Sequence, residues 1–187
     1  TAVADGQTVA CVTGATGFLG QELVAQLLEK GYAVRGTVRS ATGKNAKRLT
    51  DMADDLLNKG KFLTLIEADL LGGEAGFAPC VAGADVLFHT ASPFQSTGID
   101  DPQRQLIAPA VEGTEAATKA AIASGSVKKI VLTSSIAATM GGFGDKDRRF
   151  YPGKVRRLGA VSLGLAGVLP MSYAVGYARL GPGSAAA

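Results

Sequence analysis

Short apolar runs alternate with segments of helical periodicity over the first two thirds of the chain. Residues 8–13 form a partly β-branched apolar run that stops at Gly14, as a buried strand does. After it, apolar side chains recur every three or four residues from Phe18 to Leu28 and end at Gly31, which predicts an amphipathic helix. A strand followed by such a helix is the opening of a βα unit.

The same alternation continues along the chain. Further strands are predicted at 33–38, 62–67, 85–89 and 129–133, and further helices at 46–58, 74–81 and 102–124. Asp101 is the expected N-cap of the last helix, with Pro102 at its first position. Strands separated by helices predict an α/β fold, a Rossmann-like doubly wound parallel sheet of at least five strands with both faces covered.

The pattern changes after about residue 140. Residues 1–140 carry a net charge of −2 and residues 141–187 a net charge of +5. Residues 158–178 contain no charged side chain, which is long enough for a membrane helix, but glycines and a proline make a buried or irregular segment the favoured interpretation. We therefore expect a Rossmann domain over 1–140 and an atypical basic and apolar tail over 141–187. A membrane or protein-assembly contact through 154–179 is the less favoured alternative.

Composition narrows the class of protein. A chain of 187 residues, 47% hydrophobic and 19% charged, is long enough for a sizeable core, and a net charge of +3 is too small to predict a nucleic-acid surface. Cys11 and Cys80 lie in apolar surroundings without metal-ligand spacing, so we expect plain core residues rather than a disulfide or a metal site. The printed residues begin without a secretory leader, which favours the cytoplasm and leaves an organelle open.

The strongest motif is T-G-A-T-G-F-L-G at 13–20, between the first strand and the first helix. Its glycines, Gly14, Gly17 and Gly20, suit a tight turn in which backbone approaches a diphosphate at a helix N-terminus. Such a pattern alone is also met in ordinary glycine-rich turns. Within a βα alternation it predicts a dinucleotide site.

The end of the second strand indicates which dinucleotide binds. An acidic residue there favours NAD, whereas an arginine favours the 2′-phosphate of NADP. This strand ends at Arg39, with Lys44 and Lys47 close behind, so NADP(H) is the predicted cofactor. The alternatives are a solvated loop charge for Arg39 and the wet face of a helix for the two lysines.

Further motifs follow in order along the chain: V-R-G-T-V-R at 34–39, A-D-L at 68–70, H-T-A-S-P at 89–93, V-E-G-T at 111–114 and V-L-T-S-S at 131–135. Together with the glycine motif they resemble the extended short-chain dehydrogenase/reductases over about residues 7–140. Within that family they are most similar to the dihydroflavonol reductase, cinnamoyl-CoA reductase and carbonyl reductase branch.

The resemblance implies a role for each matching position. Residues of the glycine-rich turn would lie along the diphosphate, and Arg39 and Lys44 would hold the 2′-phosphate. One further group would flank the adenine, and another would line the path from ribose to nicotinamide. The residues of the turn are Gly14, Thr16, Gly17, Phe18, Leu19 and Gly20. The adenine group is Asp69 and Leu70, and the group on the path to the nicotinamide is Thr90, Ala91 and Ser92. Helix capping by Asp69 and strand termination by Ser92 are the alternatives.

The family's catalytic serine, tyrosine and lysine match this chain incompletely. Ser135 stands at the serine position, where a strand-end hydroxyl is the alternative, and Tyr173 is the candidate acid. No Tyr-x-x-x-Lys occurs in the sequence, and Tyr177 stands where the lysine is expected. Tyr173 could equally be an ordinary tyrosine of an apolar segment.

Two functions are therefore expected from the resemblance. The first is NADPH-dependent reduction of a ketone or aldehyde, with a small-molecule carbonyl substrate. The second is a non-catalytic NADP-binding or structural subunit of a larger assembly. The family's longer members carry a further stretch that builds the substrate pocket, so the resemblance implies a cofactor-binding half with this C-terminal substrate part missing. One hypothesis is that the tail is not the family's own sequence.

Overall fold

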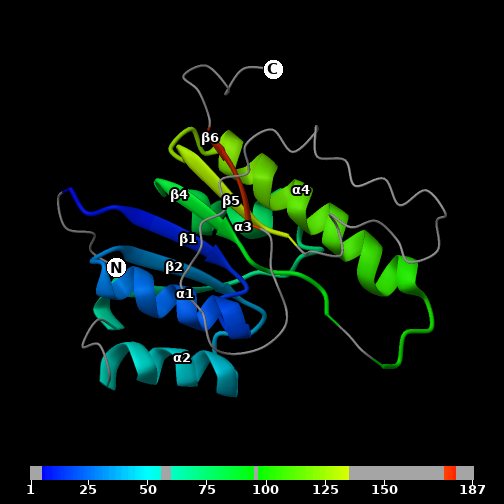
Figure 1. Ribbon diagram of the computed structural model, residues 1–187, viewed down its shortest axis with the longest axis horizontal. Helices are drawn as coiled ribbons and strands as arrows, with labels where there is room; N and C mark the ends of the chain where they lie inside the picture. The colour runs from blue at the N-terminus through cyan, green and yellow to red at the C-terminus, as the bar shows by residue number, and fades with distance from the viewer. Residues whose placement is uncertain (1–5, 56–59, 95–96, 135–174, 180–187) are drawn as a thin grey trace.

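A single mixed sheet lies at the centre of the molecule (Figure 1). The computed structural model describes residues 6–55, 60–94, 97–134 and 175–179. Within these ranges the sheet has six strands in the order β3-β2-β1-β4-β5-β6. The strands are β1 (Val9–Thr13), β2 (Ala33–Val38), β3 (Leu63–Glu67), β4 (Val86–His89), β5 (Lys129–Thr133) and β6 (Val175–Arg179).

Helices cover both faces of the sheet (Figure 1). The helices α1 (Phe18–Glu29) and α2 (Lys44–Asp55) pack on one face, and α3 (Gly73–Val81) and α4 (Ala108–Ala123) on the other. Each face has its own apolar core: leucines and a valine of α1 contribute to one, and alanines of α4 to the other. The short helices η1 (Gly60–Phe62) and η2 (Gln103–Ile107) complete the elements of the described residues. The predicted Rossmann-like α/β fold is confirmed.

Strands β1 to β5 are all parallel, and the strand order reverses next to β1. From β1 the chain crosses to β2 and then β3 on one side, and β4 and β5 lie on the other side. Such a reversal leaves a crevice at the carboxyl ends of the strands, where open α/β sheets bind ligands. The sixth strand, β6, was not predicted; it pairs antiparallel with β5, with Thr133 opposite Val175.

The segment before α4 departs from the single predicted helix. Asp101 acts as the expected cap, since its Oδ1 accepts from the Arg104 amide at 3.1 Å. The first turn, η2, is a π-helix rather than an α-helix. Pro109, the second residue of α4, has no N–H for the regular ladder, which is a physical reason for the wider turn.

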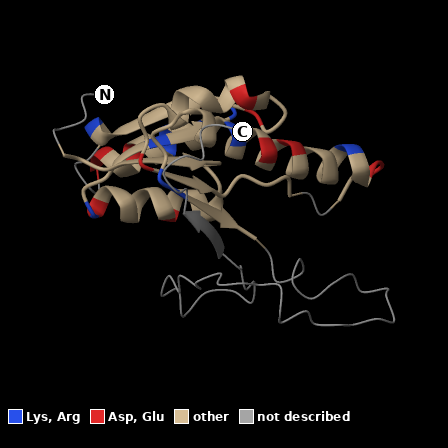
Figure 2. Cartoon of the chain, turned by 90° about the horizontal axis from the view of Figure 1, so that it is seen from above, with Lys and Arg blue, Asp and Glu red and all other residues tan. Residues whose placement is uncertain are grey.

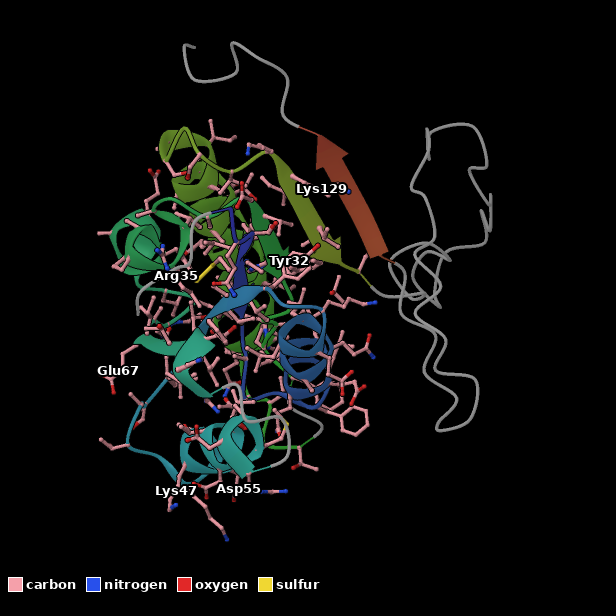
Figure 3. The ribbon with its side chains drawn as sticks, turned by 90° about the vertical axis from the view of Figure 1, so that its left-hand side faces the viewer. Tyr32, Arg35, Lys47, Asp55, Glu67 and Lys129 are labelled. Carbon is pink, nitrogen blue, oxygen red and sulfur yellow. A yellow bond between two sulfur atoms is a disulfide. The ribbon has the colours of Figure 1, made fainter. Side chains whose placement is uncertain are left out.

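Cys11 and Cys80 form a disulfide between β1 and α3, which corrects the expectation of two plain core residues. Both are fully buried, and their Cα atoms are 5.5 Å apart, within the usual range for a disulfide. The sulfur pair lies beside Arg35 in Figure 3. Arg35 of β2 donates to the carbonyl of Ala82 at the end of α3, so helix and sheet are joined by a covalent bond and a hydrogen bond.

The amino ends of three strands are joined through Asp85. Its carboxylate accepts from the Val9 amide at 3.0 Å and from Lys128 Nζ at 2.8 Å. Its own backbone exchanges hydrogen bonds with the same two residues. The Lys128 hydrogen bond, followed by that from Val9, holds the pKa of the Asp85 carboxyl below its ordinary value.

Charged residues of both signs are interspersed over the helices and loops (Figure 2). No helix in the part of the chain that the structure describes is long and apolar enough to span a membrane. Residues 154–174, which include most of the uncharged segment 158–178, lie outside the described residues.

Candidate functional site

The glycine-rich turn after β1 needs its glycines for steric reasons. Gly14 has φ +67°, and a Cβ there would lie 2.9 Å from the Ala91 Cα. A Cβ on Gly20 would collide with the carbonyl oxygen of Gly14. The turn therefore packs directly against both the loop after β4 and the first turn of α1.

Strand β2 holds the other side of this turn. The Gly14 amide donates to Thr37 Oγ1 at 3.1 Å, and the Ala15 amide donates to the Thr37 carbonyl at 3.0 Å. A Cβ on Gly36 would come within 2.6 Å of the Ala15 Cβ. Sequence reasoning missed Gly36 and Thr37 as supports of the site, although a glycine inside a buried strand is the signal for such a close approach.

The N-terminus of α1 follows the glycine-rich turn at the carboxyl end of β1. Gly17 is its N-cap residue and makes no side-chain cap, while Phe18 is 80% exposed and Leu19 is half-buried. Gln21 Nε2 donates to the Thr16 carbonyl at 2.8 Å and fixes the turn. An uncapped first helical turn presents backbone N–H groups and the positive end of the helix dipole, which suits a diphosphate.

Residues 39–43 join β2 to α2, and this loop together with Lys44, the first residue of α2, is called the basic loop. Arg39 and Lys44 are both exposed, and the Gly43 amide donates to the Ser40 carbonyl at 3.4 Å. Lys47 instead forms an ion pair with Asp51 along α2, with 2.8 Å between Nζ and Oδ1, as expected for a residue on the solvent-exposed face of a helix. Arg39 and Lys44 thus remain the candidate ligands of a phosphate here.

The A-D-L motif forms a turn after β3. Asp69 Oδ1 accepts from the Leu71 amide at 2.9 Å, and α3 has no side-chain cap, so Asp69 closes its own turn and does not cap that helix. Leu70 packs on Gly113 of α4, where a Cβ would lie 2.5 Å from the Leu70 Cδ2. This contact brings the motifs at 68–70 and 111–114 together.

A buried hydrogen-bond network supports the end of β4. Thr13 Oγ1 lies 2.9 Å from His89 Nδ1 and accepts from the amides of Thr90 and Ala91, each at 3.1 Å. His89 Nε2 lies 3.2 Å from Thr114 Oγ1 on α4. Burial lowers the pKa of His89 to about 4, so the ring is neutral at physiological pH. Sequence analysis named Thr90 and Ala91 but not the threonine and histidine behind them.

An apolar groove continues from this loop. Its lining residues lie after the carboxyl end of β4 and on the helical segment that follows: Pro93, Phe94, Leu106, Ile107, Ala110 and Val111. Phe94 is 78% exposed, and Ser92 before it is exposed too. The groove is thus an apolar surface beside the loop after β4.

The structure brings together most of the residues predicted for the cofactor. The glycine-rich turn contacts the loop at Ala91, and the ends of β2 and β3 carry Arg39 and Asp69 at the same edge of the sheet. The predicted catalytic residues, Ser135 and Tyr173, lie outside the described residues.

A family model described as the NAD dependent epimerase/dehydratase family matches residues 10–154. The chain belongs to this family. It is 41% identical over 133 residues to an anthocyanidin reductase of Vitis vinifera, covering 71% of this chain and 38% of the relative. It is 43% identical over 130 residues to a cinnamoyl-CoA reductase of Medicago truncatula, covering 70% and 38%. The predicted resemblance is thereby confirmed.

Solved structures of two similar reductases show the same fold. A yeast methylglyoxal/isovaleraldehyde reductase complexed with NADPH has a TM-score of 0.59 at 29% identity, covering 72% of this chain and 39% of that one. Vestitone reductase from alfalfa has a TM-score of 0.56 at 32% identity, covering 72% and 38%. The chain spans less than two fifths of the length of the curated relatives above. A nicotinamide dinucleotide, as predicted, is the cofactor type of the family.

Proposed function

We propose that this chain is the NADP(H)-binding part of a reductase that converts a ketone or aldehyde to an alcohol. The observation that carries the proposal is the contact of the Gly14 turn with Ala91, at the reversal of strand order. There an open helix N-terminus and the loop after β4 share one crevice, which suits a diphosphate with a nicotinamide beyond it.

The phosphorylated form of the cofactor is favoured by the loop after β2. Arg39 and Lys44 are exposed cations at the point where the adenosine ribose of a dinucleotide lies in this fold. A guanidinium pairs with the 2′-phosphate of NADP(H) through charge-assisted hydrogen bonds. Complexes of similar structures with NADPH support the same choice.

Asp69, Leu70 and the loop at 90–92 complete the proposed cofactor site. Asp69 Oδ2 has no hydrogen-bond partner within the described ranges, so it is available to an adenine amino group, and Leu70 offers an apolar contact. Thr90 Oγ1 donates to the Thr13 carbonyl at 2.6 Å, which fixes the loop that would carry the ribose and nicotinamide.

In the proposed reaction NADPH supplies a hydride to the carbonyl carbon. Ser135 would orient the carbonyl oxygen by a hydrogen bond, and Tyr173 would donate the proton that completes the alcohol. Tyr177 stands where the family's lysine is expected and carries no permanent positive charge. The apolar groove beyond Phe94 suits a flat apolar substrate of the flavonoid or phenylpropanoid kind.

Titration with NADPH and NADH tests the cofactor assignment. In Arg39→Ala the NADPH affinity falls about ten- to a hundredfold, because charge-assisted hydrogen bonds contribute roughly 1.5–3 kcal/mol, while the NADH affinity changes little. Equal losses for both cofactors contradict the assignment of Arg39.

A non-catalytic NADP-binding subunit is the second candidate, favoured by the lack of any Tyr-x-x-x-Lys in the sequence. Oxidation of NADPH in the presence of a panel of carbonyl compounds separates the two. Turnover that disappears in Ser135→Ala supports the reductase. Binding without turnover supports the subunit.

A further inference from the structure

Glu67 lies at the edge of the proposed 2′-phosphate site. It is the last residue of β3, opposite Val38 in the register, and Arg39 follows Val38 directly. Its exposed side chain comes from the outer strand β3 in Figure 3. Glu67 Oε1 accepts from the Ala41 amide at 2.8 Å.

This hydrogen bond places an anion on the basic loop itself. Ala41 stands between Arg39 and Lys44, the two candidate phosphate ligands. A phosphate bound in this loop would draw on the loop's backbone donors as well as on its cations. The carboxylate already uses one of those donors, and its charge repels a second anion close to it.

We propose that Glu67 restrains the preference of this site for NADP(H) and so leaves NAD(H) a usable cofactor. The inference rests on the proposed cofactor function. Arg39 attracts the 2′-phosphate, whereas Glu67 competes with the phosphate for the Ala41 amide and opposes its charge. NAD(H), which carries a hydroxyl in place of that phosphate, meets no such opposition.

Glu67→Gln isolates the charge from the hydrogen bond. The glutamine retains a carbonyl oxygen that accepts from the Ala41 amide, so the loop keeps its support, but the negative charge is gone. Repulsion between one carboxylate and a doubly charged phosphate several ångströms away in a watery environment predicts that NADPH binds about three- to tenfold more tightly. NADH affinity stays within about twofold, since its 2′-hydroxyl carries no charge for the Glu67 carboxylate to repel.

The test is titration of the full chain with NADPH and with NADH, followed by cofactor fluorescence. Glu29→Gln is the matched control: it removes the same charge at the exposed C-terminal end of α1, at the end of the helix opposite the proposed diphosphate site. Circular dichroism confirms that each variant is folded. The expected result is tighter NADPH binding in Glu67→Gln alone, with a difference from the unmodified chain that shrinks at about 1 M salt through screening.

Two results overturn the inference. NADPH affinity that is unchanged or weaker in Glu67→Gln shows that Glu67 does not oppose the phosphate. Equal tightening of NADPH and NADH shows a general effect of charge instead of recognition at the 2′ position. If the unmodified chain binds neither cofactor, the proposed function itself fails, a result distinct from both.

Discussion

Thr13 and His89 share a hydrogen bond of 2.9 Å whose direction can be derived. Thr13 Oγ1 accepts from two backbone amides, so its single hydrogen points to His89 Nδ1. Thr114 gives its hydrogen to the Ala110 carbonyl at 2.7 Å and therefore accepts from His89 Nε2. The imidazole is neutral, with its proton on Nε2, and it links β1, β4 and α4.

The neutral imidazole makes stability depend on pH. Burial lowers the pKa of His89 to about 4, below the ordinary 6.5, so the unfolded chain takes up the proton first as pH falls. The contribution of His89 to the free energy of unfolding is fully present above about pH 6.5 and is lost as the pH falls towards 4. Between about pH 7.5 and pH 5 the free energy of unfolding falls by about 2 kcal/mol. Urea unfolding at the two pH values measures it.

The sequence contains one histidine, which sharpens this test. An NMR titration follows this single imidazole without further assignment. We expect the His89 ring of the folded chain to stay unprotonated above about pH 5. The contribution of Asp85, whose pKa is lowered from the ordinary 3.8, is present above that value and is lost as the pH falls through it. An imidazole that titrates near 6.5 in the folded chain would contradict the network.

Replacing Thr13 tests the support of the loop after β4. Thr13→Val keeps the shape but removes the acceptor of the Thr90 and Ala91 amides, and we expect a loss of about 1–3 kcal/mol in the free energy of unfolding. Dinucleotide affinity falls with it, because the loop loses its fixed position. Thr13→Ser, which retains the hydroxyl, is the control; an equal loss in both variants would point to the methyl group instead.

The sequence predicted the local features of this site better than its supports. The glycine motif and Arg39 stand out because a turn needs glycine and a phosphate needs a cation, both within a few residues of a strand. The partners of Thr13 lie more than 70 residues away, and nothing in a strand's alternation indicates which distant strand end meets it. The prediction that Cys11 and Cys80 are plain core residues was wrong for the same reason, since the two cysteines are 69 residues apart in the sequence.

A methyl group added to Gly20 tests the close packing of the turn. Gly20→Ala sets a Cβ against the Gly14 carbonyl, which costs about 1–3 kcal/mol by overpacking and displaces the turn, so dinucleotide binding is expected to fail. Gly76→Ala is the matched control, also within a helix, with nothing near its Cβ. That variant gains up to about 1 kcal/mol from helix propensity. Thermal unfolding and NADPH titration distinguish the two.

Reduction of the disulfide tests its contribution to stability. Because it closes a loop of 69 residues, we expect dithiothreitol to lower the free energy of unfolding by about 4 kcal/mol. Chemical unfolding with and without the reductant gives the difference. In Cys80→Ala the same reductant has no effect, and a response there would assign the change to something other than this bond.

Asp85 stabilises one end of the sheet, and the proposed cofactor site lies at the other end. It fastens the starts of β1, β4 and β5 through Val9 and Lys128, far along the strands from the crevice at their carboxyl ends. A protein engineer can therefore vary the loops at the crevice to alter ligand preference while the opposite edge keeps the strands in register. The same separation lets such loops diverge between relatives while the sheet beneath them stays one scaffold.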